Sequence, residues 1–146
     1  MYYFAYGSNM SLDHMRRICG WHCQLLGRAR LPGFDVRIDM RGYLNIEEKV
    51  GEETHGILYS MDEEGLSMLD EFEGYPEIFG RMEVTVFDDH NVKYKAHVFI
   101  QPKEKNVGKE LREEFFRRVL AAAYENHLPE KWIEKLEGLG KGREKV

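Results

Sequence analysis

The feature that most constrains the fold is a series of strand-like segments, bounded by turn residues, that extends from residue 2 to residue 101. These segments are residues 2–6, 24–39, 43–46, 54–59, 81–88 and 92–101. Leu31-Pro32-Gly33 interrupts the second segment with residues typical of turns, whereas Asp89-His90-Asn91 joins the last two as a hairpin. The pattern predicts about six or seven strands in a mostly antiparallel sheet, an arrangement that can close into a barrel.

Two helices are expected within this series of strands. Ser11 and Asp62 have side chains that favour helix N-caps, and each is followed by a segment with helical spacing of apolar residues. We therefore predict a short helix that opens at residues 11–15 and a longer one at residues 62–72.

Two more helices are predicted near the C-terminus. Apolar residues recur along one face of the helix expected at Lys109–Asn126. A short terminal helix is expected to begin near Pro129 and to stop near Gly138, which leaves residues 139–146 as a mobile tail. Together these elements predict an α+β fold in which residues 1–146 form a single domain with peripheral helices.

Composition excludes several classes of protein. The chain has 146 residues, which fits one domain, and 42% are hydrophobic and 12% aromatic, enough to build a core. The net charge of -5 comes from interspersed acidic and basic residues, so a nucleic-acid-binding surface is not expected. No run approaches the ~20 apolar residues that span a bilayer, and no signal peptide is recognisable. With only two cysteines, a cytoplasmic protein is expected.

The loop Tyr6-Gly7-Ser8-Asn9 is the first candidate for a functional site. It follows a strand and precedes a helix, and its glycine allows the backbone to turn sharply and approach a ligand. Backbone N–H groups in such a loop point outward, where they can receive a carboxylate or an oxyanion. Spacing alone favours an ordinary tight turn, because Gly-Ser-Asn loops are common.

Glu73 is the second candidate. Leu66, Leu69 and Glu73 are spaced i, i+3 and i+7, so the carboxyl group projects from the apolar face of its helix. Burial and the C-terminal end of the helix dipole both disfavour a negative charge there. Both effects raise the expected pKa of Glu73, as a general base that works near neutral pH requires. The alternative is that the helix frays at Gly74 and Glu73 points to solvent.

Other residue clusters do not predict a metal or a cofactor. Cys19, His22 and Cys23 lie within five residues and lack the second ligand pair of a structural zinc site. Gly138-x-Gly140-x-Gly142 superficially matches a dinucleotide-binding loop, but it follows a helix and no strand precedes it. We expect no metal site and no organic cofactor.

Three motifs in a fixed order carry a resemblance. Tyr6-Gly7-Ser8-Asn9 follows an aromatic strand, Gly56-x-Leu58-Tyr59 occurs in a later one, and Leu69-Asp70-x-x-Glu73-Gly74 precedes Arg81. The set resembles the gamma-glutamyl cyclotransferase-like family, which includes gamma-glutamyl cyclotransferases, gamma-glutamylamine cyclotransferases and an antibiotic-maturation cyclotransferase. The similarity covers roughly residues 1–101 and implies a small closed β-barrel with helices packed outside it.

The resemblance also implies a reaction. The free α-amine of a gamma-glutamyl amide attacks its own γ-carbonyl, which yields 5-oxoproline and releases an amine without a cofactor. By position, Glu73 would be the general acid/base, and residues Tyr6 to Asn9 would hold the glutamyl group through backbone N–H groups. The family often has a tyrosine a few residues beyond the Glu-Gly pair. Here Tyr75 and Phe79 stand in that region as candidate pocket residues, so one polar substrate contact changes.

The same residues also allow two other functions. A non-catalytic module could bind a small carboxylate in the same pocket, although a binder has no reason to bury a base such as Glu73. A hydrolase could use Glu73 with Asp70 as a carboxylate pair, but no sugar-binding tryptophan lies nearby in the sequence. The partner expected is a small gamma-glutamyl substrate, whereas the leaving amine and the oligomeric state stay open.

Overall fold

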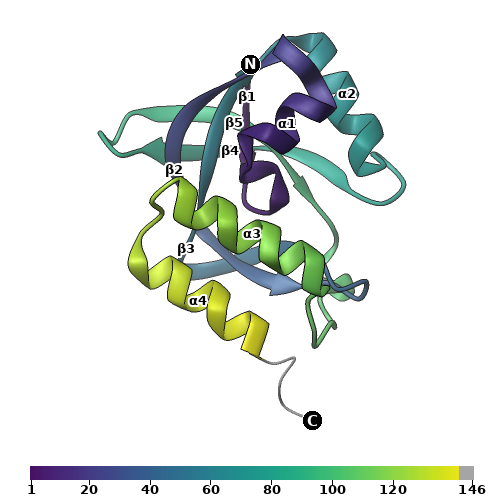
Figure 1. Ribbon diagram of the computed structural model, residues 1–146, viewed down its shortest axis with the longest axis vertical. Coiled ribbons are helices and arrows are strands. Elements are labelled where there is room, and N and C mark those ends of the chain that lie inside the picture. Colours follow the sequence, from purple (N-terminus) through teal and green to yellow (C-terminus); the bar gives the residue numbers. More distant parts are fainter. Residues whose placement is uncertain (142–146) are drawn as a thin grey trace.

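The computed structural model describes residues 1–141, which form a β-barrel with helices packed outside it (Figure 1). Within these residues the strands are β1 (Tyr2–Ala5), β2 (Cys23–Ile38), β3 (Leu44–Met61), β4 (Gly80–Asp88) and β5 (Lys93–Ile100). The helices are α1 (Leu12–Cys19), α2 (Glu63–Glu73), α3 (Glu113–Glu125) and α4 (Glu130–Lys141), with short 3-10 turns at residues 8–10, 20–22 and 103–105.

The strands close on themselves in the order β1-β3-β2-β4-β5. Every neighbouring pair is antiparallel except β1 and β5, which pair in parallel through Tyr2 with Ala96 and Tyr3 with His97. This confirms the predicted α+β class with a closed, mostly antiparallel barrel. The predicted hairpin of β4 and β5 is also confirmed, to within one residue at each end.

The prediction of six or seven strands was wrong, because the interrupted segment 24–39 forms one strand, β2, and the segments 43–46 and 54–59 belong to a single strand, β3. β2 and β3 form one hairpin, in which Cys23 pairs with Met61 at the open end and Ile38 with Leu44 at the turn. The expected break at Leu31-Pro32-Gly33 is a shift of register between Pro32 and Phe34, and the ladder resumes beyond it. The residues left unpaired at this shift, residue 33 on β2 and residues 49–52 on β3, bend the hairpin without ending it.

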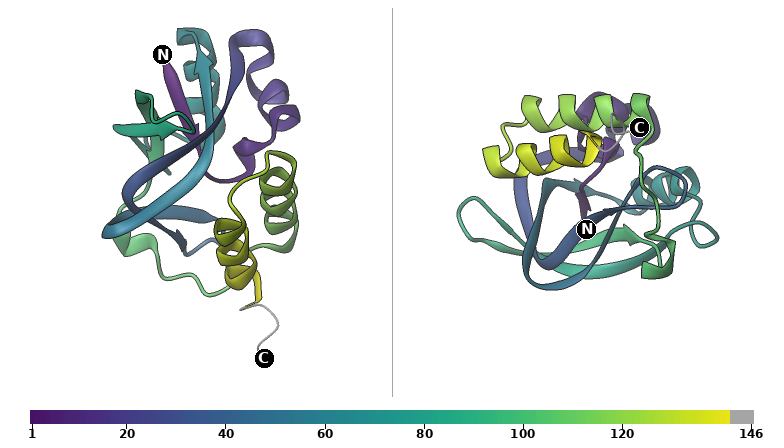
Figure 2. Two further views of the ribbon diagram at one scale, coloured as in Figure 1. Left: turned by 90° about the vertical axis from the view of Figure 1, so that its left-hand side faces the viewer. Right: turned by 90° about the horizontal axis from the view of Figure 1, so that it is seen from below.

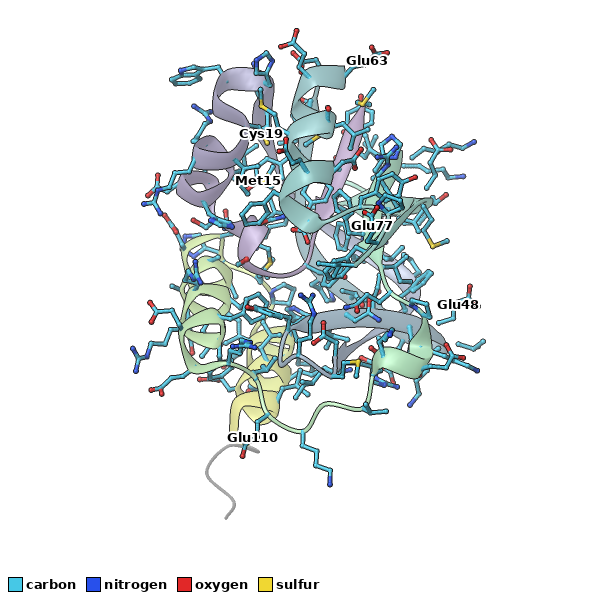
Figure 3. The ribbon with its side chains drawn as sticks, turned by 90° about the vertical axis from the view of Figure 1, so that its right-hand side faces the viewer. Met15, Cys19, Glu48, Glu63, Glu77 and Glu110 are labelled. Carbon is cyan, nitrogen blue, oxygen red and sulfur yellow. The ribbon has the colours of Figure 1, made fainter. Side chains whose placement is uncertain are left out.

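The four helices seen in the described part of the chain form two pairs (Figures 1 and 2). α1 and α2 pack against each other, and Figure 3 shows Met15 and Cys19 of α1 in the space between them. The predicted caps are confirmed, since Ser11 accepts a hydrogen bond from the His14 N–H and Asp62 from the Gly65 N–H. α3 and α4 lie side by side and cover another face of the barrel.

α3 begins later than its apolar spacing predicts. The apolar face is buried as expected, but the helix starts at Glu113 rather than at Lys109. The preceding backbone is held by the turn between β2 and β3, where Gly108 N–H donates to Ile38 O and Arg112 N–H to Gly42 O. These N–H groups stabilise an extended segment and therefore do not begin the helix.

α4 continues past its predicted stop at Gly138 and reaches Lys141, so residues 139–141 are helical and not part of a tail. A Cβ at Gly140 would lie 2.0 Å from Cζ of Phe116 in α3, so this glycine allows close packing of the two helices. The rest of the expected tail, residues 142–146, lies outside the described residues. Within residues 1–141, no helix is both long and apolar enough to cross a bilayer.

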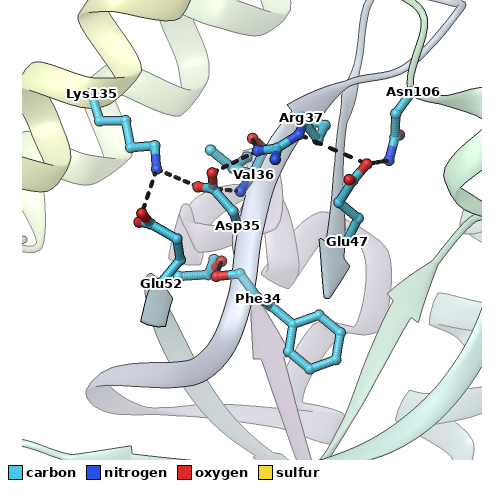
Figure 4. Close-up of polar contacts among 9 residues, drawn as sticks. Phe34, Asp35, Val36, Arg37, Glu47, Glu52, Asn106 and Lys135 are labelled. Carbon is cyan, nitrogen blue, oxygen red and sulfur yellow. Dashed lines mark hydrogen bonds and ion pairs between the residues drawn. The ribbon is translucent and has the colours of Figure 1, made fainter. Parts of the chain in front are cut away.

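α4 is also tied to the barrel by charged groups (Figure 4). Lys135 forms an ion pair with Asp35 of β2, which is 5% exposed, and lies 3.7 Å from Glu52 of β3. Arg37 donates to the other carboxylate oxygen of Asp35 at 2.6 Å. Burial alone would raise the pKa of Asp35, but the hydrogen bonds from Lys135 and Arg37 outweigh it and lower the pKa.

We expect Asp35→Asn to lower the free energy of unfolding by about 1–3 kcal/mol at pH 7, because two charge-assisted hydrogen bonds are lost. The folded pKa of Asp35 lies below its unfolded value of about 3.9, so this contribution is complete above that pH and disappears as the pH falls below it. Urea unfolding at pH 7 and pH 3 measures both effects. Glu52→Gln is the control and should cost less than about 1 kcal/mol.

Candidate active site

A pocket of about 280 Å³ lies between the end of β1, the C-terminal end of α2, the turn of the β2–β3 hairpin and α3. Its walls are mainly aromatic, with a few charged and polar groups. The lining residues are Tyr3, Tyr6, Gly7, Ser8, Asn9, His14, Arg41, Tyr43, Leu44, Phe72, Glu73, Ile78, Phe79, Phe99, Phe115 and Arg118.

Glu73 reaches this pocket because α2 ends at that residue. Gly74 adopts a left-handed conformation with φ 75°, and its N–H donates to Glu71 O while the Tyr75 N–H donates to Asp70 O. This is a Schellman cap, which terminates the helix without fraying. Glu73 therefore holds a defined position, as the apolar-face spacing predicted, and the alternative of a frayed end is wrong.

Asn9 connects the loop after β1 to the carboxyl group of Glu73. Its Nδ2 donates to Oε1 of Glu73 at 3.0 Å and to the Tyr3 hydroxyl at 2.9 Å, while its Oδ1 is buried without a partner in the described residues. The side chain is 5% exposed, so both hydrogen bonds form away from bulk water. The loop and the helix end, which lie 64 residues apart in the sequence, thus form one site.

The electrostatics of the pocket raise the proton affinity of Glu73. Burial raises the pKa of Glu73, and the hydrogen bond from Asn9 and the charge of Arg41 lower it by smaller amounts. Burial, and then the nearby Glu73, also raise the pKa values of Tyr3 and Tyr6 well above 10. Both phenols are therefore neutral hydrogen-bond donors, and the Tyr6 hydroxyl donates to Phe99 O at 2.6 Å.

The loop Tyr6–Asn9 lines the pocket, and its backbone turns into a short 3-10 segment at Ser8–Met10. Within residues 1–141, the N–H groups of Gly7, Ser8 and Asn9 have no acceptor. These donors lie at the pocket and are available to an oxygen atom of a ligand.

Phe79 and Tyr75, the two candidate pocket residues, have different positions. Phe79 lines the pocket and is buried. Tyr75 lies outside it, where its ring stacks on the guanidinium group of Arg81 at 4.6 Å. Arg81 also forms an ion pair with Asp70, so Asp70 is directed to Arg81 and does not pair with Glu73.

Cys19, His22 and Cys23 do not gather around a common centre. Both cysteines are buried free thiols, whereas Nδ1 of His22 lies 2.8 Å from the Asp62 carboxylate. Among the described residues, no group of three or more His, Cys, Asp or Glu side chains could hold a metal ion.

Comparison with known proteins now identifies the family. Residues 3–118 match the family described as gamma-glutamyl cyclotransferase, AIG2-like. The chain belongs to this family. Comparison with curated protein sequences finds no match.

Solved structures show that the gamma-glutamyl cyclotransferase fold is present. A structure named gamma-glutamyl cyclotransferase has a TM-score of 0.86 at 22% identity, with 94% of this chain and 86% of that chain covered. An uncharacterized protein from Homo sapiens has a TM-score of 0.84 at 22% identity, with 93% and 85% covered. YkqA from Bacillus subtilis has a TM-score of 0.82 at 25% identity, and the match covers 94% of this chain but 53% of YkqA.

Sequence reasoning missed several pocket residues of this gamma-glutamyl cyclotransferase-like chain. Arg41 and Tyr43 come from the hairpin turn, Phe115 and Arg118 from α3, and His14 from α1. No spacing in the sequence marks them as neighbours of Glu73, because the bend of β2–β3 and the docking of α3 bring them there. Much of the bent end of the β2–β3 hairpin lies within residues 33–53.

Proposed function

We propose that this protein is a gamma-glutamyl cyclotransferase that converts a gamma-glutamyl amide into 5-oxoproline and a free amine. The observation that carries the proposal is the carboxyl group of Glu73, which lies in an aromatic pocket with a raised pKa and a hydrogen bond from Asn9. Membership of the family and the similarity of fold agree with it.

The first step needs a base, because a free α-amine has a pKa of about 8 and is mostly protonated at neutral pH. Ionised Glu73 takes one proton from the α-ammonium group. The freed nitrogen attacks the γ-carbonyl carbon, and the second proton that it loses as the C–N bond of the ring forms passes to solvent water. Holding the substrate folded for this attack can supply an effective molarity of ~10⁵ M or more.

The second step needs an acid. The amide C–N bond of the tetrahedral intermediate breaks as Glu73 returns a proton to the departing nitrogen, which leaves as a neutral amine. A carboxyl group with a raised pKa serves both steps better than one with an ordinary pKa, because its proton affinity lies closer to neutral pH.

The oxyanion of the intermediate needs hydrogen-bond donors. The N–H groups of Gly7, Ser8 and Asn9 have no other acceptor in the described residues, and we assign them this role. The neutral hydroxyl of Tyr3, next to Asn9, helps to keep the amide of Asn9 oriented. No cofactor is needed for these steps.

The test is to incubate the purified protein with a panel of gamma-glutamyl amides and to detect 5-oxoproline by mass spectrometry. The panel should include α-amino acids, the ε-amine of lysine and simple alkylamines as leaving groups. Release of 5-oxoproline supports the proposal and identifies the preferred amine. Release of glutamate would indicate a hydrolase, and binding without turnover would indicate a carboxylate-binding module.

Asn9→Leu should move the acidic limb of the pH profile of kcat/KM to higher pH. Asn9 donates a hydrogen bond to the ionised carboxylate, so its removal raises the pKa of Glu73 further, and leucine keeps water out of the space. The measurement is 5-oxoproline release over a pH series that covers the acidic limb of the profile. A limb that stays in place or moves to lower pH would contradict the role of Asn9.

A further inference from the structure

The turn between β2 and β3, residues 39–43, is held rigidly beside the pocket. Asp39 is fully buried, and its Oδ1 accepts hydrogen bonds from the N–H groups of Arg41 and Tyr43, each at 2.9 Å. Its Oδ2 accepts a hydrogen bond from Gln101 at 2.7 Å. Because these bonds reach the main chain of Arg41, they fix the origin of its side chain independently of its guanidinium group.

Segments outside the hairpin hold the same turn from the other side. Met40 N–H donates to Lys105 O at 2.8 Å, and Arg112 N–H donates to Gly42 O at 2.9 Å. A Cβ at Gly108 would lie 1.9 Å from Asp39 O, which shows how closely the chain before α3 packs against the turn. The base of Arg41 is therefore preorganised before any ligand arrives.

The guanidinium group of Arg41 lies in the pocket wall between two rings. It stacks over Tyr43 at 5.0 Å and Phe79 at 5.8 Å. The nearest carboxylate, Asp39, is 3.7 Å away, beyond hydrogen-bond distance. Within residues 1–141, the donors of this guanidinium group make no hydrogen bond.

Arg41 also lies close to the proposed acid/base. Its positive charge lowers the pKa of Glu73, whereas the other arginine that lines the pocket, Arg118, lowers the pKa of His14. The pocket thus presents a carboxyl group at Glu73 and, at Arg41, a guanidinium group that lies 3.7 Å from Asp39 and whose donors make no hydrogen bond within residues 1–141.

We propose that Arg41, flanked by Tyr43 and Phe79, is the binding site for the α-carboxylate of the gamma-glutamyl substrate. This inference rests on the proposed cyclotransferase function. The α-carbon of such a substrate carries an ammonium group and a carboxylate. Glu73 attracts the first and Arg41 the second, and a planar guanidinium fork matches a carboxylate through two parallel hydrogen bonds.

Two opposite charges fix the orientation of the α-carbon. With the ammonium group at Glu73 and the carboxylate at Arg41, the remaining substituent of the α-carbon extends to the loop Tyr6–Asn9, which carries the free N–H donors. The γ-carbonyl then lies between the nucleophile and the proposed oxyanion donors. Arg41 is thus a specificity-determining residue that selects an α-amino acid over a simple amine.

The experiment compares two amides of the same amine, the one preferred in the substrate panel. The first is the gamma-glutamyl amide, and the second is the 4-aminobutyryl amide, which lacks only the α-carboxylate and cyclises to 2-pyrrolidinone. The ratio of their kcat/KM values is measured for the wild type and for Arg41→Gln, Arg41→Lys and Arg118→Gln, after subtraction of the uncatalysed rate. Every variant is measured with the same two amides. Any difference in basicity between their two attacking amines therefore affects all the kcat/KM ratios equally and cancels when the variants are compared.

We expect Arg41→Gln to reduce the preference for the gamma-glutamyl amide by about 10–100-fold, since a charge-assisted bidentate contact is lost. Arg41→Lys should restore part of it, and Arg118→Gln should affect both amides by the same factor. Arg41→Gln keeps the main-chain bonds to Asp39, so the fold should persist, and its melting temperature checks this.

An unchanged ratio in Arg41→Gln overturns the inference, and so does a loss of preference in Arg118→Gln instead. Both outcomes leave the proposed function intact, because 5-oxoproline is still released by the wild type. No product from either amide with wild-type protein would overturn the proposed function, and this inference with it.

Discussion

Glu73→Gln is expected to lower the rate of 5-oxoproline release by about 10²–10⁴-fold, the range that a positioned general acid/base contributes. Glutamine keeps the shape and can still accept the hydrogen bond from Asn9, but it cannot take the ammonium proton or return one to the leaving amine. The measurement is kcat with the preferred gamma-glutamyl amide, by mass spectrometry. Equal rates for both proteins would show that Glu73 is not the base.

Glu73→Gln should lower the rate but raise the stability of the folded protein at high pH. Burial raises the folded pKa of Glu73 above its unfolded value, so stability falls as the pH rises from the unfolded pKa through the folded one. Glu73→Gln removes this loss and should therefore melt at a higher temperature than the wild type above neutral pH. A higher melting temperature together with lost turnover excludes misfolding as the cause.

Glu71→Gln is the matched control for both measurements. Glu71 lies in the same last turn of α2, but its side chain is exposed to solvent. We expect it to retain turnover and to change the unfolding free energy by less than about 0.5 kcal/mol. A loss of activity as large as that of Glu73→Gln would point to the net charge of the helix end rather than to a specific acid/base.

Gly56→Ala is expected to have the largest effect on stability, a loss of about 3 kcal/mol. A Cβ at Gly56 of β3 would lie 2.1 Å from Ala5 O and 2.9 Å from Cζ of Phe4, both in β1. The first contact is with backbone that cannot rotate away, so β1 and β3 must separate. Because β1 leads directly into the loop Tyr6–Asn9, the loop should move as well and turnover should fall.

The measurement for Gly56→Ala is urea unfolding together with the kcat of any folded fraction. Gly138→Ala is the control, because a Cβ there meets nothing within 4 Å and the residue lies within α4. Alanine at an exposed helix position should raise the unfolding free energy by up to about 1 kcal/mol. Stability unchanged in Gly56→Ala would contradict the close contact between β1 and β3.

Features that depend on nearby residues could be predicted from the sequence. The N-caps Ser11 and Asp62, the hairpin of β4 and β5, and the apolar face of α2 all involve residues within a few positions of one another. The position of Glu73 on that face follows from helical geometry alone. Glycine was less informative, because Gly138 was expected to end a helix that continues past it to Lys141.

Residues brought together by long-range packing could not be predicted in this way. Pro32 and Gly33 indicate a turn locally, but the pairing with β3 on both sides keeps the strand continuous and converts the turn into a bend. That bend carries Arg41 to the pocket, and the hydrogen bonds from Gln101 to Asp39 and from the Met40 N–H to Lys105 O hold it there. No local pattern encodes contacts between segments that are about 60 residues apart in the sequence.

The sequence by itself therefore determined the class of fold, the family and the two segments that meet in the site, because short motifs and helical or strand periodicity are local properties of the chain. Only the tertiary structure decided the closure of the barrel with five strands in residues 1–141, the contact of Asn9 with Glu73, and the arrival of Arg41 opposite it. These features depend on the register of β2 with β3 and on the packing of distant side chains. The combined energy of such long-range contacts selects one folded arrangement among many.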